Sequence, residues 1–163
     1  MKAFMMSGSP SVRGTRSIAM RDFPAGYMTA ALEADEVLTA VRMPVWPAPH
    51  GAAFLEFARR HGDFAIVSVA AQIAVDDAGR VANASVTLGG VAMAPLRVPA
   101  AEQALAGQTP DDERVVAAAA ACAAVDANGD IHAPPWYRQR LARALAGRAI
   151  RAALERARGG AHG

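Results

Sequence analysis

The chain has 163 residues, of which 53% are hydrophobic and 20% charged, and its formal net charge is only +2. It can therefore bury a real core as one compact domain with an appendage, while its net charge is too small to imply a polyanion as partner. The single cysteine, Cys122, excludes an intrachain disulfide and a thiolate metal cluster and indicates a reducing, cytoplasmic setting.

The first two dozen residues differ from the rest of the chain. Residues 7–17 are rich in Ser, Gly, Pro and Arg without an apolar period, so they are predicted to be loop or disordered. Only residues 1–6 precede this polar stretch, so there is no room before it for the apolar segment of roughly 7 residues that a signal peptide needs. Residues 37–43 alternate in the manner of a strand, and the prolines at 44, 47 and 49 predict an extended linker.

An antiparallel meander is predicted next. Its three strands cover residues 52–59, 65–75 and 81–91. The middle strand is nearly all apolar and is expected to be buried on both faces, and Asp76-Asp77-Ala78-Gly79 supplies a turn before the third strand. Gly89 and Gly90 end the third strand and allow a close approach of backbone.

The second half is predicted to be helical. A short helix over 101–105 is followed by one that runs to about residue 125, with Thr109 as its N-cap and Pro110 in its first position. Its apolar run, 115–125, is well short of the ~20 residues that cross a bilayer. Pro134-Pro135 opens the last helix, and residues 159–163 are expected to fray.

The last helix is predicted to be amphipathic. The residues of its packing stripe are Tyr137, Leu141, Leu145, Ala149 and Ala152, and those of its solvent-exposed arginine stripe are Arg140, Arg143, Arg151 and Arg158. The fold class that follows is α+β: a small antiparallel meander of three to four strands packed with about three helices.

Hydrolytic and metal chemistry find little support in the sequence. The four histidines are scattered, and Cys122 has no base near it in sequence. Residues 126–130 imitate the opening of a calcium loop, but Gly129 is misplaced and the position of the bidentate Glu is filled by Tyr137, so a turn is favoured. We therefore predict no catalytic residue and no metal ligand. Nucleic-acid binding is not favoured either, because aromatic platforms are absent apart from Trp136 and Tyr137.

Four motifs carry a family resemblance over about residues 20–156. They are Tyr27–Thr39, Phe57–Ala65, Leu88–Arg97, and Asp130-Ile131-His132 followed by Tyr137-Arg138 and Leu141-Ala142. In this order and spacing they resemble the carboxy-terminal part of the FAD-binding medium subunit of the carbon monoxide dehydrogenase and xanthine dehydrogenase family, the molybdenum hydroxylases.

The resemblance implies a role in electron transfer. In this family electrons pass from molybdenum through [2Fe-2S] clusters to FAD and then to an external acceptor, so the implied partners are an FAD-binding domain, a [2Fe-2S] small subunit and a molybdenum large subunit. By position in the motif, Phe64 corresponds to the side chain that lies against the isoalloxazine ring, with Arg60 and Asp63 nearby. The choice of substrate would belong to the molybdenum subunit.

The main FAD-binding motifs of the family, an Ala-Gly-Gly-x-Ser loop and a Thr-x-Gly-Gly loop, are missing from this chain. The resemblance therefore implies that residues 1–43 are a remnant of the end of an FAD-binding domain with a linking strand, that 44–158 form the flavoprotein C-terminal α+β domain, and that 159–163 are a disordered tail. Weak or no flavin binding is expected from this chain alone. The alternative is a non-catalytic interaction module that docks through the arginine-rich last helix.

Overall fold

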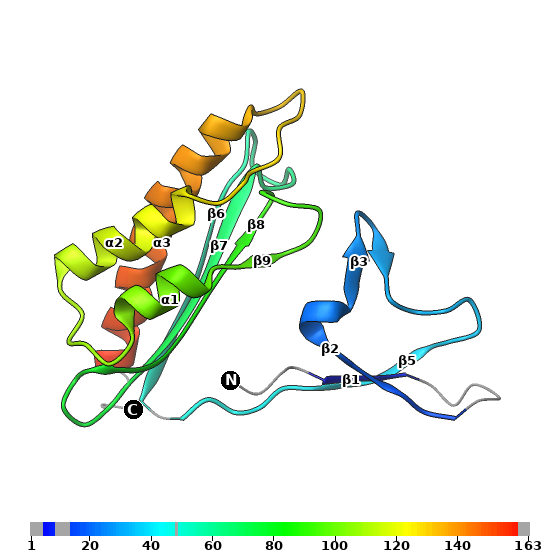
Figure 1. Ribbon diagram of the computed structural model, residues 1–163, viewed down its shortest axis with the longest axis horizontal. Coiled ribbons are helices and arrows are strands. Elements are labelled where there is room, and N and C mark those ends of the chain that lie inside the picture. Colours follow the sequence, from blue (N-terminus) through cyan, green and yellow to red (C-terminus); the bar gives the residue numbers. More distant parts are fainter. Residues whose placement is uncertain (1–4, 9–13, 48, 160–163) are drawn as a thin grey trace. The chain divides into compact units, whose positions relative to one another are not determined.

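The computed structural model describes residues 5–8, 14–47 and 49–159. The chain divides into two units, Met1–Val45 and Trp46–Gly163. Most elements of each unit are labelled in Figure 1.

The first unit is built from short antiparallel strands. They are β1 (Met5–Gly8), β2 (Ser17–Ala19) and β5 (Leu38–Arg42) in the order β2-β1-β5, the hairpin β3 (Pro24–Gly26) and β4 (Thr29–Ala30), and the 3₁₀ turn η1 (Met20–Asp22). The strand expected over 37–43 is confirmed as β5. The prediction of a loop over residues 7–17 is wrong at both ends, because Ser7 pairs with Ser17 and with Ala40 in the sheet. This pairing outweighs the weak strand propensity of these residues. Residues 9–13 lie outside the described part of the chain.

This unit has almost no core of its own. Among its described side chains, the buried hydrophobic one is Ile18, at 8% exposed. Large apolar side chains lie on the surface instead: Met20, Tyr27, Met28, Val37, Val41, Met43 and Val45. A small sheet needs an apolar face packed against another layer to be stable in isolation. The described residues of the first unit do not supply that layer.

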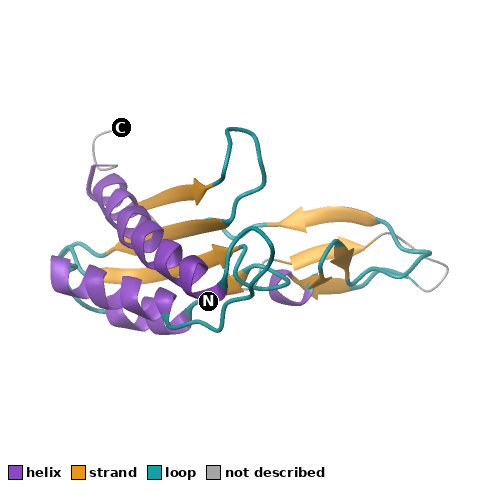
Figure 2. Ribbon diagram, turned by 90° about the horizontal axis from the view of Figure 1, so that it is seen from above, coloured by secondary structure: helices purple, strands orange, loops and turns teal. Residues whose placement is uncertain are grey.

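The second unit is the predicted meander and helices. Its sheet has the order β6-β7-β8-β9, formed by β6 (His50–Phe57), β7 (Val67–Val75), β8 (Val81–Gly89) and β9 (Leu96–Arg97). Its helices are α1 (Pro99–Leu105), α2 (Asp112–Ala123) and α3 (Pro135–Gly159). All three helices lie on one face of the sheet (Figures 1 and 2), which confirms the α+β class.

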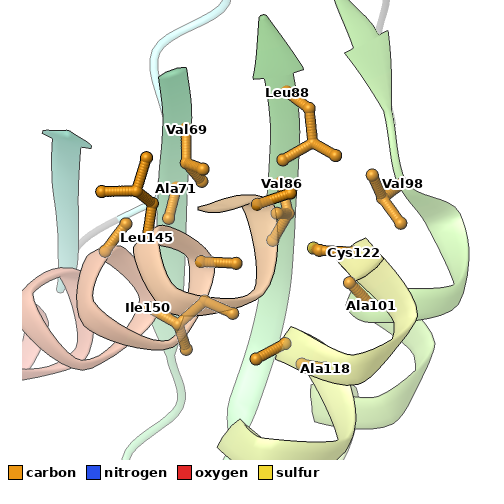
Figure 3. Packing of buried hydrophobic residues seen from close by; sticks show 14 of the residues in the cluster. Val69, Ala71, Val86, Leu88, Val98, Ala101, Ala118, Cys122, Leu145 and Ile150 are labelled. Atoms are coloured by element: carbon orange, nitrogen blue, oxygen red, sulfur yellow. The ribbon is translucent and has the colours of Figure 1, made fainter. Parts of the chain in front are cut away.

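The core lies between that face and the helices (Figure 3). Val69 and Ala71 of β7 and Val86 and Leu88 of β8 are buried against the helices, where Ile150 is also fully buried. The opposite face of β7 is open in part: Ala70 is exposed and Gln72 half-buried, although Ala74 is buried, and a shallow hollow of about 400 Å³ is lined by residues of β6, β7 and β8. The prediction that the middle strand is buried on both faces is therefore wrong, because helices cover one face alone.

The helix ends agree with the sequence in part. Pro135 occupies the first position of α3 as expected, and Gly159 is its last residue, whereas 160–163 lie outside the described residues. The predicted cap of α2 is wrong. Asp111, not Thr109, is the N-cap, and its carboxylate accepts from the backbone N–H of Arg114 at 2.9 Å, which leaves Pro110 before the helix.

α3 is long enough to cross a bilayer but too polar. It has 25 residues, and its outer face carries several arginines. Within the described ranges, no helix combines the length and the apolar character that a membrane span requires.

Cys122 is expected to be an unreactive thiol. It is fully buried in α2, and burial raises the pKa of the thiol to about 11, with the charge of Glu102 adding to the effect. Since the thiolate is the reactive form, a thiol reagent should modify the native chain at least about a hundredfold more slowly than the chain in denaturant. The measurement is the rate of thionitrobenzoate release with and without guanidinium. Equal rates would contradict the buried position.

Candidate functional site

The loop between β6 and β7 carries the three residues that the sequence proposes as a flavin-contacting group. Its base is closed by the backbone N–H of Ile66, which donates to the carbonyl of Phe57 at 2.8 Å. Its tip turns at Gly62, whose φ of 88° is the left-handed conformation that glycine adopts without strain. Residues 58–66 thus project from the end of the sheet as a closed turn, named the flavin-facing loop below after the role predicted for its tip.

The three predicted residues lie together at this tip. Phe64 is fully exposed, with a relative exposure of 101%, and Arg60 and Asp63 are exposed beside it. The backbone N–H of Asp63 donates to the carbonyl of Arg60 at 3.2 Å, which sets the turn. An aromatic ring held clear of the core can stack on a planar group, whereas a buried ring could not. The flavin contact of Phe64, Arg60 and Asp63 remains a prediction.

A second loop, residues 124–134 between α2 and α3, lies at the same end of the sheet (Figure 1). The Asp130 carboxylate accepts from the backbone N–H groups of His132 and Ala133, both at 2.9 Å, as a turn-forming aspartate does. A turn is thus present, but it spans 130–133 and shares only Asp130 with the residues 126–130 for which it was predicted. In the described part of the chain no cluster of three His, Cys, Asp or Glu side chains could hold a metal ion.

Arg138 joins the two loops and is the residue whose role the sequence did not reveal. Its side chain is only 7% exposed. Its Nη1 donates to the carbonyl of Ile66 at 2.6 Å and to that of Gly90, and its Nη2 donates to Asp130 Oδ2 at 2.6 Å. A signal was present, because Arg138 stands four and seven residues before Ala142 and Leu145, the spacing of one helix face, although the predicted packing stripe did not include Arg138 or Ala142.

Gly90 allows this junction to form. It follows β8 with a φ of 77°, and a Cβ atom there would lie 2.3 Å from the carbonyl oxygen of Ile66. The close backbone approach expected from the Gly89-Gly90 pair is therefore confirmed at Gly90, and its partner is the base of the flavin-facing loop. Three segments distant in sequence meet at one guanidinium.

Acid should weaken this junction. Hydrogen bonds from the backbone N–H groups of Ala133 and His132, and then from Arg138, lower the pKa of Asp130 from its ordinary 3.8 to about 2. Because the folded-state pKa is the lower one, the stability that ionised Asp130 contributes is present above pH 4 and is lost as pH falls toward about 2. Asp130→Asn should flatten the pH dependence of the unfolding free energy in this window. Some pH dependence of the unfolding free energy should remain in this variant, because the pKa of Asp76 is lowered as well. The main cause is a hydrogen bond from the backbone N–H of Arg80, and the Arg80 side chain adds to it.

Exposed apolar groups surround the junction. The rings of Phe57 and Tyr137 meet edge to face at 6.4 Å between centroids, and Tyr137 meets Trp136 in the same way at 5.7 Å. Trp136 is 62% exposed and Ile131 is 96% exposed. With the guanidinium groups of the loop tip, this end of the unit can offer stacking area and positive charge.

The arginine stripe of α3 is partly used within the unit. Arg151 donates to Asp112 of α2, and Arg158 donates to the carbonyl of Pro110. Arg140 and Arg143 remain exposed. Two of the four stripe arginines therefore make contacts within the unit, although all four are exposed.

Comparison with known proteins places this architecture among flavoproteins. Residues 52–153 match the family model described as CO dehydrogenase flavoprotein C-terminal domain. The chain is 35% identical over 146 residues to the carbon monoxide dehydrogenase medium chain of Afipia carboxidovorans, covering 89% of this chain and 50% of that protein. It is 37% identical over 141 residues to the nicotine 6-hydroxylase medium subunit of Paenarthrobacter nicotinovorans, covering 86% of this chain and 49% of that subunit.

A solved structure agrees with these matches. A chain of quinoline 2-oxidoreductase from Pseudomonas putida 86 superimposes with a TM-score of 0.84 at 34% identity, over 95% of this chain and 53% of that one. The chain thus spans about half the length of the relatives that it matches. The sequence similarity covers the flavin-facing loop and Arg138, since both fall within 52–153.

Proposed function

Because the chain belongs to the family of CO dehydrogenase flavoprotein C-terminal domains, we propose that it forms one wall of the FAD site in the flavin subunit of a molybdenum hydroxylase. The observation that carries this proposal is the fully exposed Phe64 at the tip of a loop whose base is fixed by Arg138. A ring presented in this way offers a flat apolar surface to a planar cofactor.

The residues present fit one part of FAD. Phe64 would stack on the isoalloxazine ring, and Arg60, with Asp63 beside it, would stabilise negative charge on the reduced ring. Two loop N–H groups, those of Asp63 and Ile66, are not free for the diphosphate, because each is already bonded to a backbone carbonyl. Since this chain also lacks the two main FAD-binding motifs of the family, we propose that it binds FAD weakly or not at all on its own. When bound, the FAD would supply electron transfer to an external acceptor.

The first unit supports the need for a further domain. Its described side chains bury one hydrophobic residue, Ile18, and expose several large ones, including Tyr27, Met28 and Met43. Covering such a surface is favourable at roughly 25 cal/mol per Å² of apolar area. We propose that residues 1–43 are the end of an FAD-binding domain, that 44–158 are the flavoprotein C-terminal domain, and that an FAD-binding domain packed on the first unit covers the exposed apolar groups.

The names of the relatives support a multi-subunit setting. One is the alpha subunit of the 6-hydroxypseudooxynicotine dehydrogenase complex and another is a medium chain of carbon monoxide dehydrogenase. We propose a [2Fe-2S] small subunit and a molybdenum large subunit as partners of this chain too, with electrons passing from molybdenum through the clusters to FAD. The lone buried Cys122 supports a reducing, cytoplasmic location.

A chimaera tests the proposal. This chain would replace the matched half of the Afipia carboxidovorans medium chain, and the dissociation constant of FAD would be measured by titration. Phe64→Ser should weaken binding about tenfold, because stacking on one aromatic ring contributes about 1 to 1.5 kcal/mol. Phe64→Tyr keeps the ring and is the matched control. Equal affinities for the Ser and Tyr variants would argue against a flavin-facing Phe64.

A further inference from the structure

We propose that Arg138, held by Asp130, is a positioning residue that fixes the flavin-facing loop 58–66 in the shape that presents Phe64. The effect on the loop stands on the contacts of this chain alone. Its consequence for flavin rests on the proposed function.

The loop has few other attachments, one of which is a side-chain contact of 3.4 Å between Arg59 Nη1 and His132 Nδ1 of the second loop. Residues 59–64 are all exposed, and the described backbone bonds that close the loop are Ile66 N–H to Phe57 and Asp63 N–H to Arg60. A segment with so few buried contacts opens locally at low free energy. Arg138 adds an anchor at the base, because its Nη1 binds the Ile66 carbonyl from a helix 72 residues away in sequence.

A guanidinium suits this position better than any other side chain. One planar group reaches the carbonyls of Ile66 and Gly90 and the carboxylate of Asp130 in different directions, which a lysine ammonium on a flexible stem cannot reproduce with the same geometry. Asp130 is itself fixed by two backbone N–H groups of its own loop, so its second oxygen is oriented toward the guanidinium by contacts that do not involve the loop 58–66. The anchor is therefore preorganised.

Site-resolved amide hydrogen exchange of the full chain tests the loop directly. Arg138→Lys should raise exchange at Ile66 and Asp63 at least about tenfold, while the amide of Val69 in the central strand β7 keeps the wild-type rate. A role confined to overall stability would move all of these amides by the same factor, because they would exchange through global unfolding. The selective change is the predicted result, and a uniform change would overturn the proposal.

A matched control is available at β9, the edge strand of the sheet. Arg97 makes a partly buried, two-bond pair with Glu102, at 2.5 and 2.8 Å, and also donates to a backbone carbonyl, that of Ala84. Arg97→Lys removes a comparable contact without touching the loop, so exchange at Ile66 should be unchanged. If Arg97→Lys accelerates Ile66 as much as Arg138→Lys does, the proposal is wrong.

Asp130→Asn is the milder variant should Arg138→Lys fail to fold. The amide keeps an oxygen for His132 and Ala133 but loses the charge that holds the guanidinium. Exchange at Ile66 should rise by a smaller factor than in Arg138→Lys, again without change at Val69. An unchanged rate at Ile66 would overturn the role of Asp130.

A second readout separates this proposal from the function on which it rests. In the chimaera, Arg138→Lys should alter the visible circular dichroism of bound FAD, because the ring at 64 would no longer be held in one place. If the wild-type chimaera shows no effect of Phe64 on FAD, the proposed function fails, whereas the exchange result for the loop still stands. If exchange is selective and the FAD signal does not change, the loop is positioned by Arg138 but not for flavin.

Discussion

Replacement of Gly51 by alanine should destabilise the second unit by about 3 kcal/mol. Gly51 lies in β6 where α3 crosses the strand, and a Cβ atom there would lie 2.1 Å from the carbonyl oxygen of Ala153 and 2.5 Å from the backbone nitrogen of Ala157. Both neighbours are helix backbone, which cannot rotate away as a side chain can. The strand and the helix must separate, and total stability of a small domain is only about 5 to 15 kcal/mol.

The measurement is the free energy of unfolding in urea, followed by circular dichroism. Ala52→Ser is the matched control, because it adds one heavy atom to the next residue on the opposite, open face of the strand. We expect a change within about 0.5 kcal/mol for the control. If Gly51→Ala is as stable as this control, the close crossing of α3 over β6 is wrong.

Gly90→Ala should have a comparable effect, at the site itself. Two costs combine: alanine at a φ of 77° is strained by about 1 to 2 kcal/mol, and its Cβ would lie 2.3 Å from the Ile66 carbonyl oxygen. That oxygen also accepts from Arg138, so relief of the overlap must displace the base of the flavin-facing loop. We expect a loss of about 3 kcal/mol in unfolding free energy.

Gly79→Ala separates the two costs. Gly79 has nearly the same φ, 75°, but nothing lies within 4 Å of a Cβ atom there. Gly79→Ala should therefore lower the free energy of unfolding only by the cost of placing alanine at a positive φ, about 1 to 2 kcal/mol. Urea denaturation of both variants measures the difference. Equal losses would show that the contact between Gly90 and the loop base does not constrain the chain.

The sequence predicts the second unit well because its signals are local. Alternating apolar residues in β6 to β8 and the helical period after residue 99 are enough to place strands and helices within a few residues. The N-cap of α2 is predicted at the wrong residue because Thr109 and Asp111 are both residue types that cap helices well. Only the conformation of the backbone determines that the Asp111 carboxylate reaches a free N–H group of the helix. Whether helices cover one face of β7 or both likewise depends on tertiary packing, which the apolar sequence of the strand does not reveal.

The sequence predicts the exposed residues at the tip of the loop but not the buried residues at its base. Phe64, Arg60 and Asp63 stand in one short loop, so a motif could place them together. Arg138 is 72 residues from Ile66 and 48 from Gly90, and no local pattern reveals that these three segments converge. An arginine at the spacing of a packed helix face shows only that a buried partner is needed, because a guanidinium is rarely buried unpaired.

The central claim is that the ring at position 64 lies against the isoalloxazine of FAD. In the chimaera, Phe64→Trp would place an electron-rich indole there, and flavin fluorescence measures its proximity because an indole in contact quenches the emission. Phe54→Trp is the control, since Phe54 is an exposed aromatic on the open face of β6. We predict strong quenching for Phe64→Trp and wild-type emission for Phe54→Trp; equal emission from the two variants would contradict the account.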